Sequence, residues 1–113
     1  MPGGDAMRQP TRPPKIEGAL LLRIVRNAVR TGQYALKPHA RQRCRERALP
    51  VSFVEWALET GRHVPSRDRY ETRHGAWNYC IEGPSPDGAA LRVIVTFQDW
   101  MMVVTVVRLG KED

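Results

Sequence analysis

The chain has 113 residues, of which 42% are hydrophobic, enough for one domain with a modest core. Its two cysteines make no disulfide framework, and no apolar run approaches the length of a membrane span. The first residues also lack the apolar core of a signal peptide. These features predict a cytosolic protein with reduced thiols and no membrane partner.

Positive charge is concentrated in the first two thirds of the chain. The formal net charge is +6, yet residues 1–74 hold 15 Lys+Arg against 7 Asp+Glu, a net charge of +8. Most of these cations are arginines, which bind phosphate bidentately and stack on bases. The bias favours RNA, DNA or an acidic protein as partner, although a GC-rich genome would produce the same bias without any partner.

The N-terminal third contains one clear helix. Residues 1–15 are rich in proline, glycine and charge, which predicts a disordered tail before a single domain over residues 16–110. Residues 17–30 have one broad apolar face and an opposite basic side, which predicts an amphipathic helix that ends at Gly32. Residues 34–37 are predicted to form a short edge strand.

The stretch from His39 to Gly61, HARQRCRERALPVSFVEWALETG, has the densest local pattern in the sequence. It predicts two helices joined at a tight corner. The first begins at Pro38 and is ended by Pro50, because the residue before a proline is pushed out of the α region. The second has Ser52 as its N-cap and Glu55 completing a capping box, and Gly61 supplies a left-handed C-terminal residue.

Downstream, the hydrophobic period changes to that of strands. Residues 77–82 alternate between apolar and polar side chains, and residues 70–73 predict a shorter strand. Residues 91–97 and 101–109 are β-branched runs around a Gln98-Asp99 turn, and their nearly continuous apolar character predicts central strands. The predicted core between the second motif helix and the sheet consists of Phe53, Trp56, Leu58, Ile81, Val93, Val95, Val104 and Val106.

The order of these elements predicts an α+β fold. The N-terminal helix and the two-helix motif are expected to pack on one face of a three- to four-stranded antiparallel sheet. No internal repeat interrupts this order.

A row of cations follows one face of the first motif helix. His39, Arg43 and Arg47 are spaced at i, i+4 and i+8 and therefore lie side by side. One interpretation is a solvated helix face. The other is an anion-binding row, in which a titratable imidazole lies beside two permanent cations. The residues predicted to bind nucleic acid are Arg23, Arg26, Arg41, Arg43 and Arg47.

The His39–Gly61 stretch resembles the signature of Domain of Unknown Function family 4258, whose members share an H-A-x-x-R-x-x-E-R pattern, a Ser-started helix and a glycine. With weaker matches in the strands, the resemblance covers roughly residues 34–109. Two positions depart from the pattern: Ala48 stands where a glycine is common, and Arg92 stands where a histidine is common. The family is similar in element order to the RelE and ParE toxins and to BrnT, which implies a RelE-like fold. Many such toxins cut RNA without a metal, and others poison DNA gyrase.

Two functions remain open. One is a non-catalytic module that binds nucleic acid or a protein, with an acidic antitoxin-like protein as one candidate partner. The other is a metal-independent endoribonuclease of a toxin–antitoxin system. Because guanidinium does not deprotonate near neutral pH, Arg92 cannot act as the acid or base that a histidine there would provide, which favours the binding module.

RNA cleavage through a cyclic phosphate needs a base, an acid and a cation for the phosphorane charge. The catalytic candidates are His39 as base or acid, Arg43 and Arg92 as phosphate clamps, and Tyr79 as a stacking group or proton donor. The remaining histidines, His63 and His74, are expected to be plain surface. Neither they nor the cysteines have the spacing of a metal motif, so we expect no metal and no cofactor.

Overall fold

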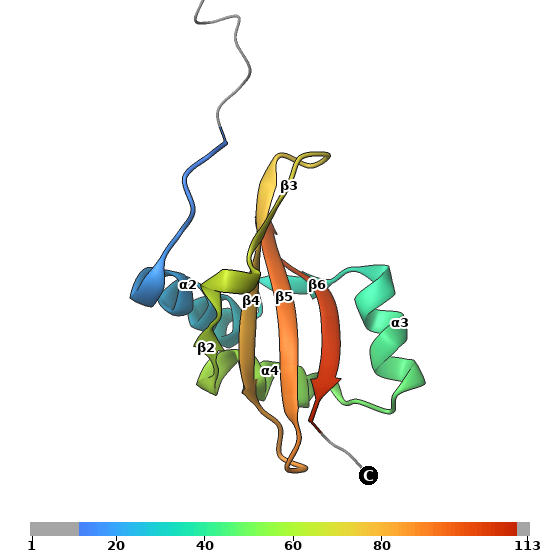
Figure 1. Cartoon of the computed structure of the whole chain (residues 1–113). Coiled ribbons are helices and arrows are strands. Elements are labelled where there is room, and N and C mark those ends of the chain that lie inside the picture. The colour runs from blue at the N-terminus through green and yellow to red at the C-terminus, as the bar shows by residue number, and fades with distance from the viewer. Residues whose placement is uncertain (1–11, 111–113) are drawn as a thin grey trace, which may run out of the picture.

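The computed structural model describes residues 12–110, which hold three α-helices and six strands (Figure 1). No helix in this range is long and apolar enough to cross a membrane. The predicted amphipathic helix and the predicted strands are confirmed, with bounds that shift by one or two residues. The elements in chain order are α2 (Gly18–Thr31), β1 (Tyr34–Leu36), α3 (Pro38–Glu46), α4 (Val51–Thr60), β2 (Arg62–His63), the 3-10 helix η1 (Pro65–Arg67), β3 (Arg69–Glu71), β4 (Ala76–Pro84), β5 (Ala90–Gln98) and β6 (Trp100–Leu109).

The sheet is larger than predicted and is mixed rather than antiparallel. Its strands lie in the order β1-β6-β5-β4-β2, and β3 pairs with another part of β4. β1 runs parallel to β6, with Tyr34 opposite Met101, whereas the other pairs are antiparallel. The prediction of three or four antiparallel strands was wrong because the two-residue strand β2 is too short to show a strand period, and because the parallel pairing of β1 with β6 joins segments far apart in the sequence.

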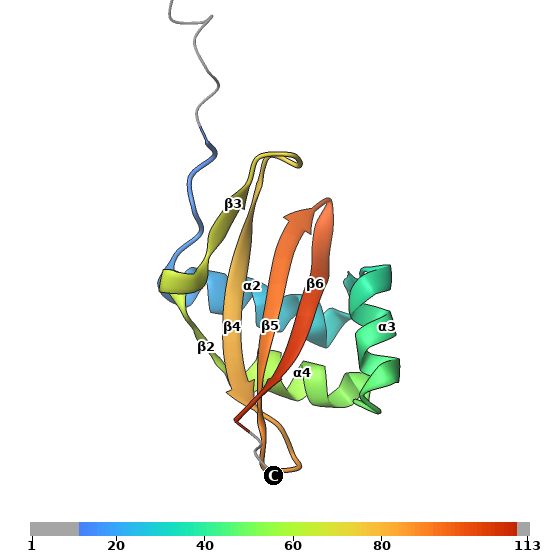
Figure 2. The same ribbon diagram turned by 45° about the vertical axis from the view of Figure 1, so that its right-hand side comes forward.

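The three helices do not all pack on one face as predicted. Figure 2 shows α2 and α4 side by side behind the sheet, whereas α3 lies beyond the β6 edge. α2 crosses behind the sheet and so delivers β1 to the β6 edge. The core between α2, α4 and the sheet is fully buried at Leu21, Val25, Val54, Leu58, Ile81, Leu91, Val93, Val95 and Val103.

Two glycines let α4 lie against β4. Gly61 does not adopt the predicted left-handed conformation, since its φ is −84° and its ψ is −172°. Instead, a Cβ on Gly61 would come within 2.4 Å of the Ala57 carbonyl oxygen, and a Cβ on Gly83 would come equally close to the same atom. Both positions therefore require glycine because two backbones meet there.

The predicted capping of α4 was wrong by one residue. The helix begins at Val51, directly after Pro50, and Ser52 makes no capping bond. The Glu55 carboxylate accepts a hydrogen bond from the Tyr34 hydroxyl instead, and burial together with this carboxylate raises the pKa of Tyr34. The side of α4 that faces the core carries Val54, Ala57 and Leu58, so Trp56 points outward and is 51% exposed rather than part of the core.

The end of α3 contains a strained residue. The helix stops at Glu46, well before Pro50, and Ala48 has a φ of +50°. A β-carbon is crowded in this left-handed region, where glycine is at ease. Ala48 is the position at which a glycine is common in the family that the sequence resembles. The turn persists because Leu49, directly after it, is buried in the core.

We expect Ala48→Gly to stabilise the protein. Glycine relieves the left-handed strain, and the gain should be about 1 kcal/mol after its larger unfolded-state entropy is included. For a domain of this size, that corresponds to a rise of about 4 °C in the melting temperature. Calorimetry on the purified variant checks this, and a lower melting temperature would contradict it.

We expect Gly83→Ala to destabilise the protein by about 3 kcal/mol or more, because the new methyl group meets backbone that cannot move aside. Gly32→Ala is the matched control. Gly32 ends α2 with a φ of +73° and has open space around it, so this change adds only left-handed strain. Urea titrations should show the larger loss for Gly83→Ala. The reverse order would contradict the close approach of α4 to β4.

Candidate functional site

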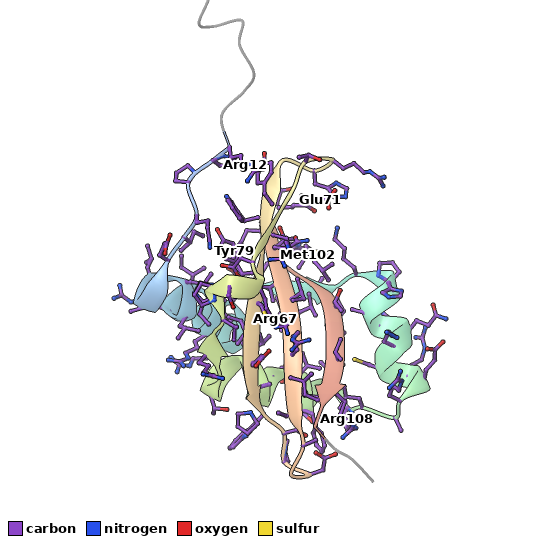
Figure 3. All side chains as sticks on the ribbon, in the orientation of Figure 1. Arg12, Arg67, Glu71, Tyr79, Met102 and Arg108 are labelled. Atoms are coloured by element: carbon purple, nitrogen blue, oxygen red, sulfur yellow. The ribbon has the colours of Figure 1, made fainter. Side chains whose placement is uncertain are left out.

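One face of the sheet carries no α-helix in the described part of the chain. Tyr79, Ile81 and Val93 face α2 and α4 and are buried. Because side chains alternate along a strand, the residue directly after each of them points to the opposite face. The 3-10 helix η1 lies over part of this face and brings Arg67 to it, and Met102 of β6 lies on the same face (Figure 3).

A basic pocket of about 180 Å³ opens on this uncovered face. Its basic side chains come from two distant segments: Lys37 precedes α3, and Arg73 and His74 lie in the turn between β3 and β4. The Lys37 backbone amide donates to the Val103 carbonyl at 2.9 Å, which fixes this residue beside β6. One carboxylate, that of Glu71, also lines the pocket. The remaining lining residues are Asn78, Thr96, Gln98 and Val104.

The pocket suits a small anion. A water molecule takes up about 30 Å³ in the liquid, so the cavity has room for a hydrated phosphate group. Lys37 and Arg73 supply fixed positive charge, and the amides of Asn78 and Gln98 supply neutral donors. The Thr96 hydroxyl does not donate a hydrogen bond into the pocket, because it donates to the Trp77 carbonyl at 2.8 Å.

The arginines of α3 continue this basic surface along the edge of the sheet. His39 is exposed and Arg43 is half-buried. Arg43 and Arg47 line a small groove with Arg108 of β6, which Figure 3 shows at the opposite end of the sheet from Glu71. α3 therefore runs from the basic pocket at its N-terminal end to this groove at its C-terminal end.

The charge on α3 is not neutralised from within the described residues. Arg108 forms a salt bridge with Asp87. The pKa of the Asp87 carboxyl is lowered, most strongly by its hydrogen bond from the Ser85 hydroxyl and next by its hydrogen bond from Arg108. Among residues 12–110, by contrast, no carboxylate lies within 4.0 Å of the guanidinium nitrogens of Arg43 or Arg47. The same holds in that range for Arg41 and Arg45.

The structure does not bring the four catalytic candidates together. Arg92 lies on the uncovered face, where its Nε contacts the Glu82 carboxylate at 2.9 Å. Tyr79 is on the opposite face and is 3% exposed, with its hydroxyl accepting the Ile16 amide at 2.9 Å. His39 and Arg43 share a face of α3, as their spacing predicted, but neither Arg92 nor Tyr79 joins them.

The arginines of α2 belong to a different layer from those of α3. Arg23 is exposed on the outer side of α2. Arg26 is half-buried and donates to the Gly61 carbonyl at 3.1 Å, which ties α2 to the end of α4. The predicted nucleic-acid contacts are therefore divided between two elements, with Arg41, Arg43 and Arg47 on α3 and its C-terminal end and the other two on α2.

Of the two remaining histidines, His63 differs from the expected plain surface, whereas His74 is exposed as expected. The His63 ring is held by the Asp68 carboxylate at 2.8 Å and its side chain is 7% exposed, which makes it structural. His74 lies in the basic pocket. The sequence feature that could have drawn attention to His74 is its place in a basic turn, Arg73-His74-Gly75, between two predicted strands. No sequence feature indicated that Lys37 would line the pocket, because its position depends on the parallel pairing of β1 with β6.

The cysteines are part of the core rather than ligands. Cys44 and Cys80 are both buried, and burial raises the pKa of each thiol. Within the described range, no group of three or more His, Cys, Asp or Glu residues is placed to hold a metal ion.

Comparisons with curated proteins and with solved structures found no match. One family model does match, over residues 36–108, and its description is "Domain of unknown function (DUF4258)". The matched region contains α3, α4 and the whole sheet apart from the first residues of β1, and it excludes α2. Because the match covers well over half of the chain, this protein belongs to the DUF4258 family.

Proposed function

We propose that this protein is a nucleic-acid-binding module whose phosphate contacts run along α3 from the basic pocket to the groove at Arg47. The observation that supports this most directly is the lack of a carboxylate partner, among residues 12–110, for the arginines of α3. Arginines without a carboxylate partner are free to contact phosphates, and each phosphate that they neutralise releases cations condensed on the nucleic acid, which favours binding.

The dimensions of the surface fit this role. A helix rises about 1.5 Å per residue, so Lys37 and Arg47 lie about 15 Å apart along the α3 axis. That length accommodates several successive phosphates, which follow one another at about 3.4 Å of helix axis per strand in a duplex. The basic pocket provides room for one further phosphate next to the neutral donors of Asn78 and Gln98.

We expect the double variant Arg43→Gln/Arg47→Gln to bind a labelled RNA or DNA oligonucleotide more weakly at low salt. Each lost phosphate contact should reduce the slope of log affinity against log salt by about 0.7 to 0.9, so two contacts should reduce it by about 1.5. Fluorescence anisotropy over a salt series measures both quantities.

The double variant Arg23→Gln/Arg30→Gln is the matched control, because it also removes two positive charges, from exposed positions on α2 in the other layer of the molecule. It should leave the salt slope nearly unchanged. Equal loss in both variants would point to net charge alone, and a wild-type protein that does not bind at low salt would remove the proposal.

A second candidate, a metal-independent endoribonuclease of RelE-like toxin type with an acidic antitoxin-like partner, has one observation in its favour. His74 shares the basic pocket with Lys37 and Arg73. RNA cleavage through a cyclic phosphate needs a titratable group next to cations that hold the phosphate. In this candidate His74, which lines the pocket, transfers the proton rather than His39 of α3, which does not.

The cleavage candidate makes its own prediction. Incubation of total RNA with wild-type protein should give fragments, His74→Ala should give none, and His39→Ala should cleave at a rate near that of the wild type. Circular dichroism on both variants controls for folding. Absence of cleavage by the wild-type protein would remove this candidate and leave the binding proposal standing.

A further inference from the structure

The segment Arg12–Ile16, here called the strap, lies along β3 and β4 ahead of α2 (Figure 3). Two hydrogen bonds join its main chain to β4. The Trp77 indole donates to the Pro13 carbonyl at 2.9 Å, and the Ile16 amide donates to the Tyr79 hydroxyl at 2.9 Å. The sequence predicted disorder up to residue 15; residues 1–11 lie outside the described part, whereas Arg12 to Lys15 make defined contacts.

Both cations of the strap have a dedicated site. The Arg12 guanidinium lies 4.8 Å from the centre of the Tyr70 ring, and the Lys15 ammonium lies 5.1 Å from the centre of the Trp77 ring. These two rings pack edge to face with centres 5.4 Å apart. Cations are attracted to such ring faces by the negative charge of the π system.

A buried carboxylate completes the Lys15 site. The Lys15 ammonium is 2.9 Å from an oxygen of Asp68, whose side chain is 0% exposed. His63 contacts the same oxygen at 2.8 Å, and the other oxygen accepts the Cys80 amide at 2.9 Å. A buried carboxylate that accepts several hydrogen bonds interacts strongly with a nearby cation. The Asp68 carboxylate therefore favours a lysine at position 15 of the strap.

The strap is attached like a bound peptide rather than like a strand. Among residues 12–110 it pairs with no strand, and its contacts come from side-chain sites and the two hydrogen bonds above. A cavity of about 170 Å³, lined in part by Pro14, Trp77 and Phe97, remains between the strap and the sheet. Gly18, the first residue of α2, has a φ of +57°, which turns the chain where the helix begins.

We propose that the strap groove, formed by Asp68, Tyr70, Trp77, Tyr79 and Phe97, is a binding site for an extended, basic, proline-containing segment of a partner protein, and that the strap occupies it in cis. Prolines favour the extended conformation in advance, and an indole donor to a proline-segment carbonyl between aromatic rings is a general mode of peptide recognition. The strap shows which ligand chemistry the groove accepts: arginine, two prolines, lysine and an aliphatic residue.

The strap groove is independent of the proposed nucleic-acid surface. Trp77 and Tyr79 lie on one face of β4, whereas Asn78, between them in sequence, lines the basic pocket on the other face. Binding of a peptide is therefore expected to leave the α3 arginines free.

The test uses the full chain and an acetylated, amidated peptide with the sequence of residues 12–17, RPPKIE. The control peptide, RPPMIE, replaces the lysine with methionine and keeps the length and the apolar stem. Binding is followed through the Trp77 indole N–H resonance, assigned by its loss in Trp77→Phe. The double variant Arg12→Ala/Lys15→Ala weakens the strap, so it should bind RPPKIE at roughly tenfold lower peptide concentration than the wild type, in which the tethered strap competes.

A second measurement covers the case in which the double variant does not fold. In the wild-type protein, excess RPPKIE should speed hydrogen exchange of the Ile16 amide, because displacement breaks its bond to Tyr79, and RPPMIE should not. Resonance shifts in the folded variant or faster Ile16 exchange in the wild type, specific to RPPKIE, support the proposal. It is overturned if RPPKIE produces neither effect, or if both peptides act equally.

Discussion

The close approach of α4 to β4 is the constraint on which the rest of the structure depends. With no side chain at Gly61 or Gly83, the end of the helix rests directly on the strand backbone. That contact sets the depth at which Val54 and Leu58 enter the core. It also leaves the Gly61 carbonyl where Arg26 can bond to it, so α2 is held beside α4. Both helices are thereby confined to one face, and the opposite face stays open.

The two faces of the sheet consequently carry different chemistry. Alternation along β4 sends Asn78 toward the cations of the open face, and Trp77 toward the aromatic groove beneath the N-terminal strap. The same strand therefore separates a site suited to anions from a site suited to cations. If both proposed ligands bind, the strand would keep these oppositely charged groups on opposite faces of the sheet.

The sequence was most informative where long segments kept one period. α2, β5 and β6 were predicted almost to the residue because each has nine or more residues with a steady apolar pattern. Trp56 was misplaced because the buried face of α4 is formed by Val54, Ala57 and Leu58, and Trp56, two residues after Val54, lies on the other side of the helix. The basic pocket could not be predicted, since Lys37 reaches Arg73 only through the pairing of β1 with a strand far along the chain. The Arg92–Glu82 pair depends on strand register, which the sequence leaves open.

The position of α3 also has a consequence for solubility. β1 pairs with β6 only from Met101 to Val103, and α3 lies against β6 beyond that point. Unpaired amide and carbonyl groups along an apolar strand such as β6 form a template for another chain. The basic helix shields this edge with a surface that repels its own copies. Loss or unfolding of α3 would therefore convert a folded domain into a seed for intermolecular β-pairing, even with α2 and α4 still packed on the sheet.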